Sequence, residues 1–73
     1  MAKTGVYRQT LEVDEEELQT FEIPYYYTTI EGEIYLVFDE VFRNSVTTYI
    51  PTQEEVDMVR GKIMSLLKLG GAV

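Results

Sequence analysis

The sequence predicts an α+β fold: a small antiparallel sheet of three or four strands with one C-terminal helix packed on one face. Apolar and polar residues alternate with the period of a strand through much of the first fifty positions. Apolar residues then recur at helical spacing, and Pro and Gly separate the segments. With 73 residues the chain is long enough for one domain at most, so residues 1–73 are predicted to fold as a single domain.

Three strands are predicted before residue 40. Residues 5–13 alternate roughly between apolar and polar side chains, as a strand with one buried face does. Residues 20–30 are rich in aromatic and β-branched side chains, but Pro24 lacks a backbone donor. This strand is therefore expected at a sheet edge, or with a bulge at the proline. After a turn at Glu31-Gly32, residues 33–38 are the most apolar run and are predicted to be the central strand.

The next segment combines apolar side chains with turn residues. Residues 39–44 contain Asp, Glu, Arg and Asn around two apolar positions, which indicates a hairpin connection with a widened or bulged loop. Residues 46–50 then form a short predicted strand, because Thr and Tyr suit one. Pro51 prevents the strand from continuing.

A single helix is predicted over about residues 53–69. Thr52 and Glu55 have the spacing of a capping box, and Gly70 supplies the stop. The helix carries one apolar stripe, made of Val56, Val59, Ile63, Leu66 and Leu67. We expect this stripe to cover the sheet at Phe21, Ile34, Leu36 and Phe38. The other face of the sheet would then be left to tyrosines and carboxylates.

The composition argues against an enzyme. The chain has no histidine and no cysteine, so the usual general base near neutral pH and the Ser-His and Cys-His nucleophile pairs are missing. A zinc site also lacks its usual ligands, and no metal or other cofactor is predicted. No apolar run is long enough to span a membrane and no signal segment opens the chain, so a cytoplasmic protein is expected.

The charge of the chain is unevenly distributed. The formal net charge is −7, but residues 1–57 hold all 13 acidic side chains and three basic ones, a net −10. Residues 58–73 hold three basic side chains and no acidic one. Such an acidic surface repels phosphates, which disfavours direct nucleic-acid binding, and it attracts a protein partner with a basic surface. The alternative interpretation is that the charge serves solubility alone.

Two local features are candidates for partner binding. The first is the dense acidic run after the first strand, which could equally be a solvated turn. The second is the run of three tyrosines, because alternation along a strand turns at least one ring towards solvent or a partner. Cross-strand packing within the sheet would also explain these tyrosines. The residues predicted to bind a partner are Asp14, Glu15, Glu16, Glu17, Tyr25 and Tyr27.

In size, acidity and lack of cysteine, the whole chain resembles the small acidic proteins that bacteriophages make to bind and redirect host machinery. The nearest kind is the RNA-polymerase inhibitor of a Xanthomonas phage. The resemblance includes no residue motif, so it assigns no functional residues. It implies a protein that acts in the host cytoplasm, binds host RNA polymerase and prevents promoter engagement by the sigma-containing enzyme.

Three functional hypotheses follow from these features. The first is a non-enzymatic protein-binding module that docks on a basic surface of a larger intracellular machine, most concretely bacterial RNA polymerase, and inhibits or redirects it. The second is a DNA mimic that inhibits a nuclease, repair or restriction enzyme, which a double row of carboxylates would support. The third is a small structural subunit, which self-association would support. The oligomeric state stays open.

Overall fold

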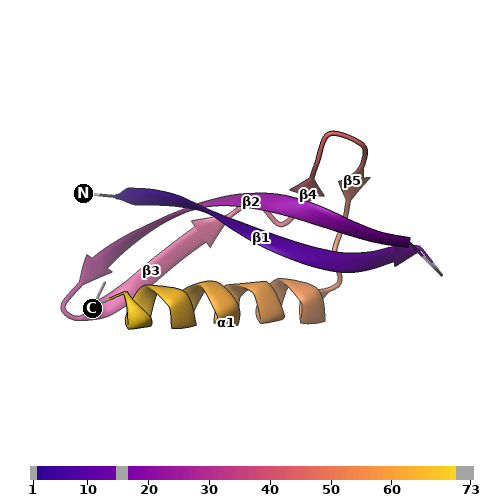
Figure 1. Cartoon of the computed structure of the whole chain (residues 1–73). Coiled ribbons are helices and arrows are strands. Elements are labelled where there is room, and N and C mark those ends of the chain that lie inside the picture. The colour runs from indigo at the N-terminus through magenta and orange to yellow at the C-terminus, as the bar shows by residue number, and fades with distance from the viewer. Residues whose placement is uncertain (1, 15–16, 71–73) are drawn as a thin grey trace.

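The computed structural model describes residues 2–14 and 17–70 and confirms the predicted α+β fold. The main sheet contains three antiparallel strands in the order β1-β2-β3, and a separate two-stranded sheet pairs β4 with β5. The helix α1 lies along one face of the main sheet, and the β4–β5 hairpin stands near one end of it (Figure 1). The elements are β1 (Lys3–Asp14), β2 (Glu17–Ile30), β3 (Glu33–Phe38), β4 (Phe42–Arg43), β5 (Thr48–Tyr49) and α1 (Gln53–Leu69).

The helix and the β2–β3 turn follow the sequence prediction closely. The helix has the predicted bounds, 53–69, and the strand at 33–38 is also as predicted. Glu31 and Gly32 both have positive φ, 53° and 82°, as a two-residue hairpin turn of type I′ requires. This turn matches the right-handed twist of the strands, so it directs β3 back alongside β2.

The predicted positions of two strands within the sheet are wrong. β2 is the central strand and β3 lies at an edge. Pro24 is tolerated in the central strand because the β2–β3 ladder ends at the pair of Tyr25 with Phe38, one residue after the proline. On its other side Pro24 is in register with Val6 of β1. The missing N–H therefore faces a position where the neighbouring strand has already ended, and no ladder bond is lost.

The second half of the predicted sheet is smaller than expected. The predicted strand at 46–50 is reduced to β5, which pairs with β4 through Phe42–Tyr49 and Arg43–Thr48 and does not join the main sheet. The first two strands, by contrast, extend beyond their predicted bounds of 5–13 and 20–30. β1 and β2 stay paired almost to their connection, with a register shift between Glu12 and Asp14.

The core lies between the sheet and the helix. From α1 the buried side chains are Val56, Val59, Ile63 and Leu67, whereas Leu66 of the predicted stripe is 52% exposed. The rest of the core comes from the three main strands and the hairpin: Leu11, Phe21, Ile23, Leu36, Phe38 and Phe42. Arg60 fastens the helix to β3, since its guanidinium donates to the Leu36 carbonyl at 3.1 Å and lies 4.7 Å from the centre of the Phe38 ring.

The capping box at the start of α1 includes a third residue. Glu55 Oε1 accepts from the Thr52 N–H at 2.8 Å, and the Glu55 N–H donates to the Thr52 hydroxyl at 3.2 Å. The Tyr49 hydroxyl also donates to Glu55 Oε1, at 2.6 Å, which joins β5 to the helix. Burial acts to raise the pKa of the Glu55 carboxyl, but the hydrogen bonds from Tyr49 and Thr52 outweigh it and hold that pKa below the usual 4.5.

This arrangement predicts a pH-dependent contribution of Glu55 to stability. A carboxyl whose pKa is lowered by folding stabilises the fold above its unfolded pKa, and this contribution is lost as the pH falls through the folded value. We expect Glu55→Gln to lower the free energy of unfolding by about 1 kcal/mol at pH 7. The difference from the unmodified protein should shrink below pH 4.5. Urea titrations from pH 7 to pH 3 measure this, with the exposed Glu54→Gln as the control; a difference independent of pH contradicts it.

Candidate functional site

The face of the main sheet opposite α1 has no helix over it in the part of the chain that the structure describes, and it carries a group of apolar side chains. Alternation along β1, β2 and β3 turns every second residue towards this face, away from the core. In Figure 1 it is the side of the sheet that the helix does not cover. We call the apolar group at its centre the open-face patch and define it as Val6, Pro24, Tyr26, Tyr35 and Val37.

The register of the strands brings these residues together. Val6 lies opposite Pro24, and Tyr26 lies opposite Val37. Tyr35 is two residues before Val37 and completes the group on β3. The exposed fractions are 60% for Val6, 55% for Tyr26, 51% for Tyr35 and 58% for Val37. A contiguous apolar group of this kind on a small protein marks an interaction surface more often than scattered exposed residues do.

Charged pairs border the patch at one end. Arg8 and Glu22 lie directly opposite each other on β1 and β2, with 3.5 Å between Nη2 and Oε1. Asp39 follows β3 and pairs with Arg43 at 2.9 Å, and both line a small pocket together with Pro24. The hydrogen bond from Arg43, helped by the Val41 N–H, lowers the pKa of Asp39. An apolar centre with a charged, solvated rim is the usual composition of a protein-binding surface.

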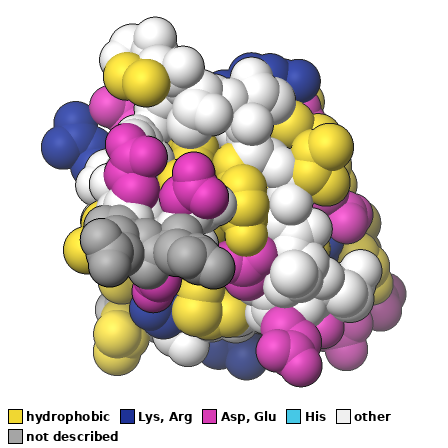
Figure 2. Space-filling model, turned by 90° about the vertical axis from the view of Figure 1, so that its right-hand side faces the viewer, with side chains coloured by type: hydrophobic (Ala, Val, Ile, Leu, Met, Phe, Trp, Pro, Cys, Tyr) yellow, Lys and Arg dark blue, Asp and Glu magenta, His cyan; other side chains and the backbone are white. Residues whose placement is uncertain are grey.

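Two residues of the predicted acidic run, Asp14 and Glu17, lie at the end of the sheet and not beside this patch. Asp14 ends β1 and Glu17 begins β2, and the two are paired in register. Glu15 and Glu16 lie outside the described residues. The first turn of α1, with Glu54, is at the same end of the molecule (Figure 1). Figure 2 views this end and shows Asp and Glu side chains at several places, separated by hydrophobic and neutral ones.

The predicted tyrosines lie on the opposite face from the patch. Tyr25 and Tyr27 are half-buried and pack against the core, with ring centres 6.3 Å apart. The Tyr25 ring lies over Gly5, where a Cβ atom would collide with it. Tyr26, between them, points to the open face. Its orientation could have been found from the sequence, because Phe21 was expected to face the helix and shares its parity with Tyr25 and Tyr27.

Asp14 and Glu17 are therefore not brought into one group with the predicted tyrosines. Glu17 and Tyr27 are ten residues apart along β2, roughly 33 Å in an extended strand. The described carboxylates are found at the end of the sheet, at the border of the patch, in the β2–β3 turn and at the helix start. The open-face patch was not predicted from the sequence, because Val6 and Val37 are about thirty positions apart and come together only through the register of β1 and β3 with β2.

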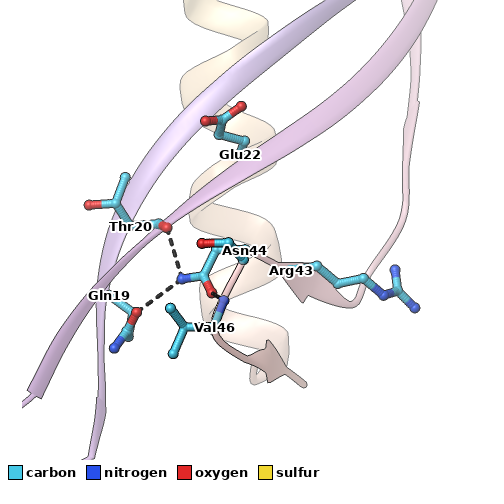
Figure 3. A pocket seen from close by; sticks show the side chains of 7 residues that line it. Gln19, Thr20, Glu22, Arg43, Asn44 and Val46 are labelled. Carbon is cyan, nitrogen blue, oxygen red and sulfur yellow. Dashed lines mark hydrogen bonds between the residues drawn. The ribbon is translucent and has the colours of Figure 1, made fainter.

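A polar pocket between β2 and the β4–β5 turn is organised by one side chain. Asn44 Nδ2 donates to Gln19 Oε1 at 3.0 Å and to the Thr20 carbonyl at 3.1 Å (Figure 3). Its Oδ1 accepts from the backbone N–H groups of Val46 and Thr47, both at 2.8 Å. The amide of Asn44 thus uses its donor group to hold the turn against β2 and its oxygen to order the turn itself. The pocket presents no nucleophile paired with a base, so we assign it a structural role.

Within residues 2–14 and 17–70, no cluster of acidic side chains is arranged to hold a metal ion. No helix in this part of the chain is long and apolar enough to cross a membrane. The comparisons with known proteins found no matching family model, and no significantly similar curated protein or solved structure. The fold and the candidate site define a small α+β domain in which the helix covers one face of the main sheet and leaves the other face open.

Proposed function

We propose that the protein is a non-enzymatic protein-binding module whose contact surface is the open-face patch. The observation that carries this proposal is that Val6, Tyr26 and Val37 are adjacent and each more than half exposed on the uncovered face of the sheet. The strands hold these side chains in fixed positions, so little conformational entropy is lost on binding. Tyr is well suited to such a contact because it is large, rigid and has a polar tip.

The charge of the chain indicates the kind of partner. With a net charge of −7 and carboxylates at the rim of the patch and at the end of the sheet, the protein complements a basic surface. Asp14 and Glu17 would act at longer range, by steering the encounter, while the patch supplies the buried contact. Docking on a larger intracellular machine would then inhibit or redirect that machine.

The most concrete partner is bacterial RNA polymerase, with the bacterial cytoplasm as the place of action. This part of the proposal rests on the resemblance in size, acidity and lack of cysteine to the small phage proteins that redirect host machinery. The distribution of the described carboxylates over separate places favours docking through the apolar patch over mimicry of duplex DNA.

Replacing two residues of the patch tests the proposal. Tyr26→Thr combined with Val37→Thr removes the central apolar pair but keeps side chains that favour strands. We expect this variant to bind purified RNA-polymerase holoenzyme at least about tenfold more weakly, because central aromatic contacts carry most of the energy of an interface. Promoter-dependent transcription in its presence should recover in parallel. Binding is measured on immobilised holoenzyme, at two salt concentrations.

The matched control is Leu69→Gln, which removes an equally apolar side chain, 85% exposed, at the far end of the helix. It should leave binding unchanged. If the unmodified protein does not bind the holoenzyme, the proposed partner is wrong. If it binds and the double variant binds equally well, the open-face patch is not the contact surface.

A further inference from the structure

Among residues 2–14 and 17–70, no strand pairs with the outer edge of β1, a strand of 12 residues. β1 lies at the edge of the main sheet and pairs only with β2. A long edge strand presents a row of backbone N–H and C=O groups that another strand could use. Natural proteins usually shorten, bend or cover such an edge. A free edge of this length is therefore a candidate site for pairing with another strand.

Two observations on β2 show which residues of β1 face this free edge. The Thr20 carbonyl accepts from Asn44, which belongs to the turn after β4 and not to β1, so the Thr20 backbone is directed away from its register partner Thr10 and the two share only a side-chain contact. Pro24 has no N–H and is nevertheless in register with Val6. Both pairs are therefore of the non-hydrogen-bonded type. It follows that the even-numbered residues of β1 direct their N–H and C=O groups to the free edge.

A contact within β1 agrees with this assignment. The Gln9 side-chain amide donates to the Thr10 carbonyl at 3.0 Å, which is consistent with a carbonyl that points to the edge and not to β2. The same even-numbered residues place their side chains on the open face. The edge groups and the open-face side chains of β1 thus belong to the same residues, up to Glu12, where the regular register with β2 ends.

The charges along β1 are complementary to the same strand in the opposite direction. Lys3 and Arg8 lie in its first half, and Glu12 and Asp14 lie in its second half. Arg8 and Glu12 both project on the open face, two positions on either side of Thr10. Neither of the ion pairs found among the described residues includes Glu12. A parallel partner strand would place like charges together, whereas an antiparallel copy of β1 places opposite charges together.

We propose that a second copy of this chain pairs with the free edge of β1, antiparallel and centred on Thr10. In this register Arg8 of each copy lies opposite Glu12 of the other, and Thr10 lies opposite Thr10. Even residues meet even residues, so both helices lie on one side and the two main sheets join into one continuous sheet of six strands. The two open-face patches then share one surface. This inference goes beyond the proposed function and does not depend on it.

The contact has a modest size, so we expect a weak dimer with a Kd on the order of 10–100 μM. Sedimentation velocity of the full chain between about 5 μM and 1 mM covers this range. The expected result is a monomer–dimer equilibrium that weakens at high salt, because two exposed ion pairs contribute to it. A chain that stays monomeric at all these concentrations overturns the proposal.

A charge exchange tests the register. Arg8→Glu and Glu12→Arg each replace two attractive pairs in the dimer by two repulsive ones, and each should weaken association about tenfold. The double variant exchanges the charges and should restore association to within about threefold of the original. Circular dichroism checks that each variant is folded, since Arg8 also pairs with Glu22. Absence of rescue in the folded double variant overturns the register.

A second pair of variants tests the backbone contact. Thr10→Pro removes an N–H that faces the edge but none that bonds to β2, so the fold should persist while the dimer is lost. Thr10→Val is the matched control, because it also removes the side-chain hydrogen bond to Thr20, 2.9 Å long, but keeps the N–H. We expect the valine variant to dimerise. Equal association of the two folded variants means that the free edge is not used and overturns the proposal.

Discussion

Replacement of Phe21 by alanine is expected to lower the free energy of unfolding by about 3–5 kcal/mol. Phe21 is fully buried, and its ring centre lies 6.2 Å from that of Phe42 and 5.7 Å from that of Tyr49. Phe21 belongs to the core between the sheet and α1, and it also links β2 to the β4–β5 hairpin. A single core in a chain of this size supplies only about 3–5 kcal/mol, so most molecules of this variant should be unfolded at room temperature. Far-UV circular dichroism during a urea titration measures the change.

Phe21→Leu is the control for this prediction. Leucine keeps most of the apolar volume but loses the ring contacts with Phe42 and Tyr49, so an intermediate loss of about 1–2 kcal/mol is expected. The order of stability should be the unmodified protein, then the leucine variant, then the alanine variant. A loss below about 1 kcal/mol for alanine would show that the cluster around Phe21 is not the centre of the core.

The helix and the β2–β3 hairpin could be predicted from the sequence because their signals are local. The bounds of α1 follow from the capping box at Thr52 and Glu55 and from the spacing of the apolar residues. The β2–β3 turn follows from Gly32 between two runs with strand character. In each case the residues that decide the structure are within a few positions of the element itself.

The order of the strands could not be predicted in the same way. Pro24 correctly signals a position that needs no backbone donor on one side, but a ladder that ends one residue later satisfies this as well as a sheet edge does. To distinguish a sheet edge from a ladder that ends early, one must know where β3 ends relative to β2, and the sequence of β2 alone does not contain this information. The position of the β4–β5 turn likewise involves the contact between Asn44 and β2, across more than twenty positions of sequence.

The candidate site shows the same limit. The acidic run and the tyrosine run each consist of consecutive residues of one type, and such clusters are easily recognised in a sequence. The open-face patch instead takes single residues from three strands, and Val6 and Val37 meet through Tyr26 only once β1 and β3 are both paired with β2. Strand parity was sufficient to place Tyr26 outwards, but the register was needed to find its neighbours.

Asn44 is the residue that couples the β4–β5 turn to the main sheet, and Asn44→Ala is expected to cost about 2–3 kcal/mol. The change removes four side-chain hydrogen bonds: two from the amide to Gln19 and Thr20 of β2, and two accepted from the backbone of the turn. With the turn released, Phe42 and Tyr49 on either side of it are less firmly held against Phe21. The loss should therefore be larger than that of an isolated turn residue, and urea titration measures it.

Asn44→Asp distinguishes the hydrogen bonds that Asn44 makes to β2 from those that it accepts within its own turn. The aspartate keeps an oxygen for the Val46 and Thr47 N–H groups but places negative charge beside the Gln19 oxygen and the Thr20 carbonyl. If the bonds to β2 carry most of the coupling, Asn44→Asp should be nearly as unstable as Asn44→Ala. Ser45→Ala, in the same turn and exposed, should change the free energy of unfolding by less than about 0.5 kcal/mol. An aspartate variant as stable as the original protein would show that Asn44 organises only its own turn, and that the hydrophobic contacts of Phe42 and Tyr49 alone attach the hairpin to the sheet.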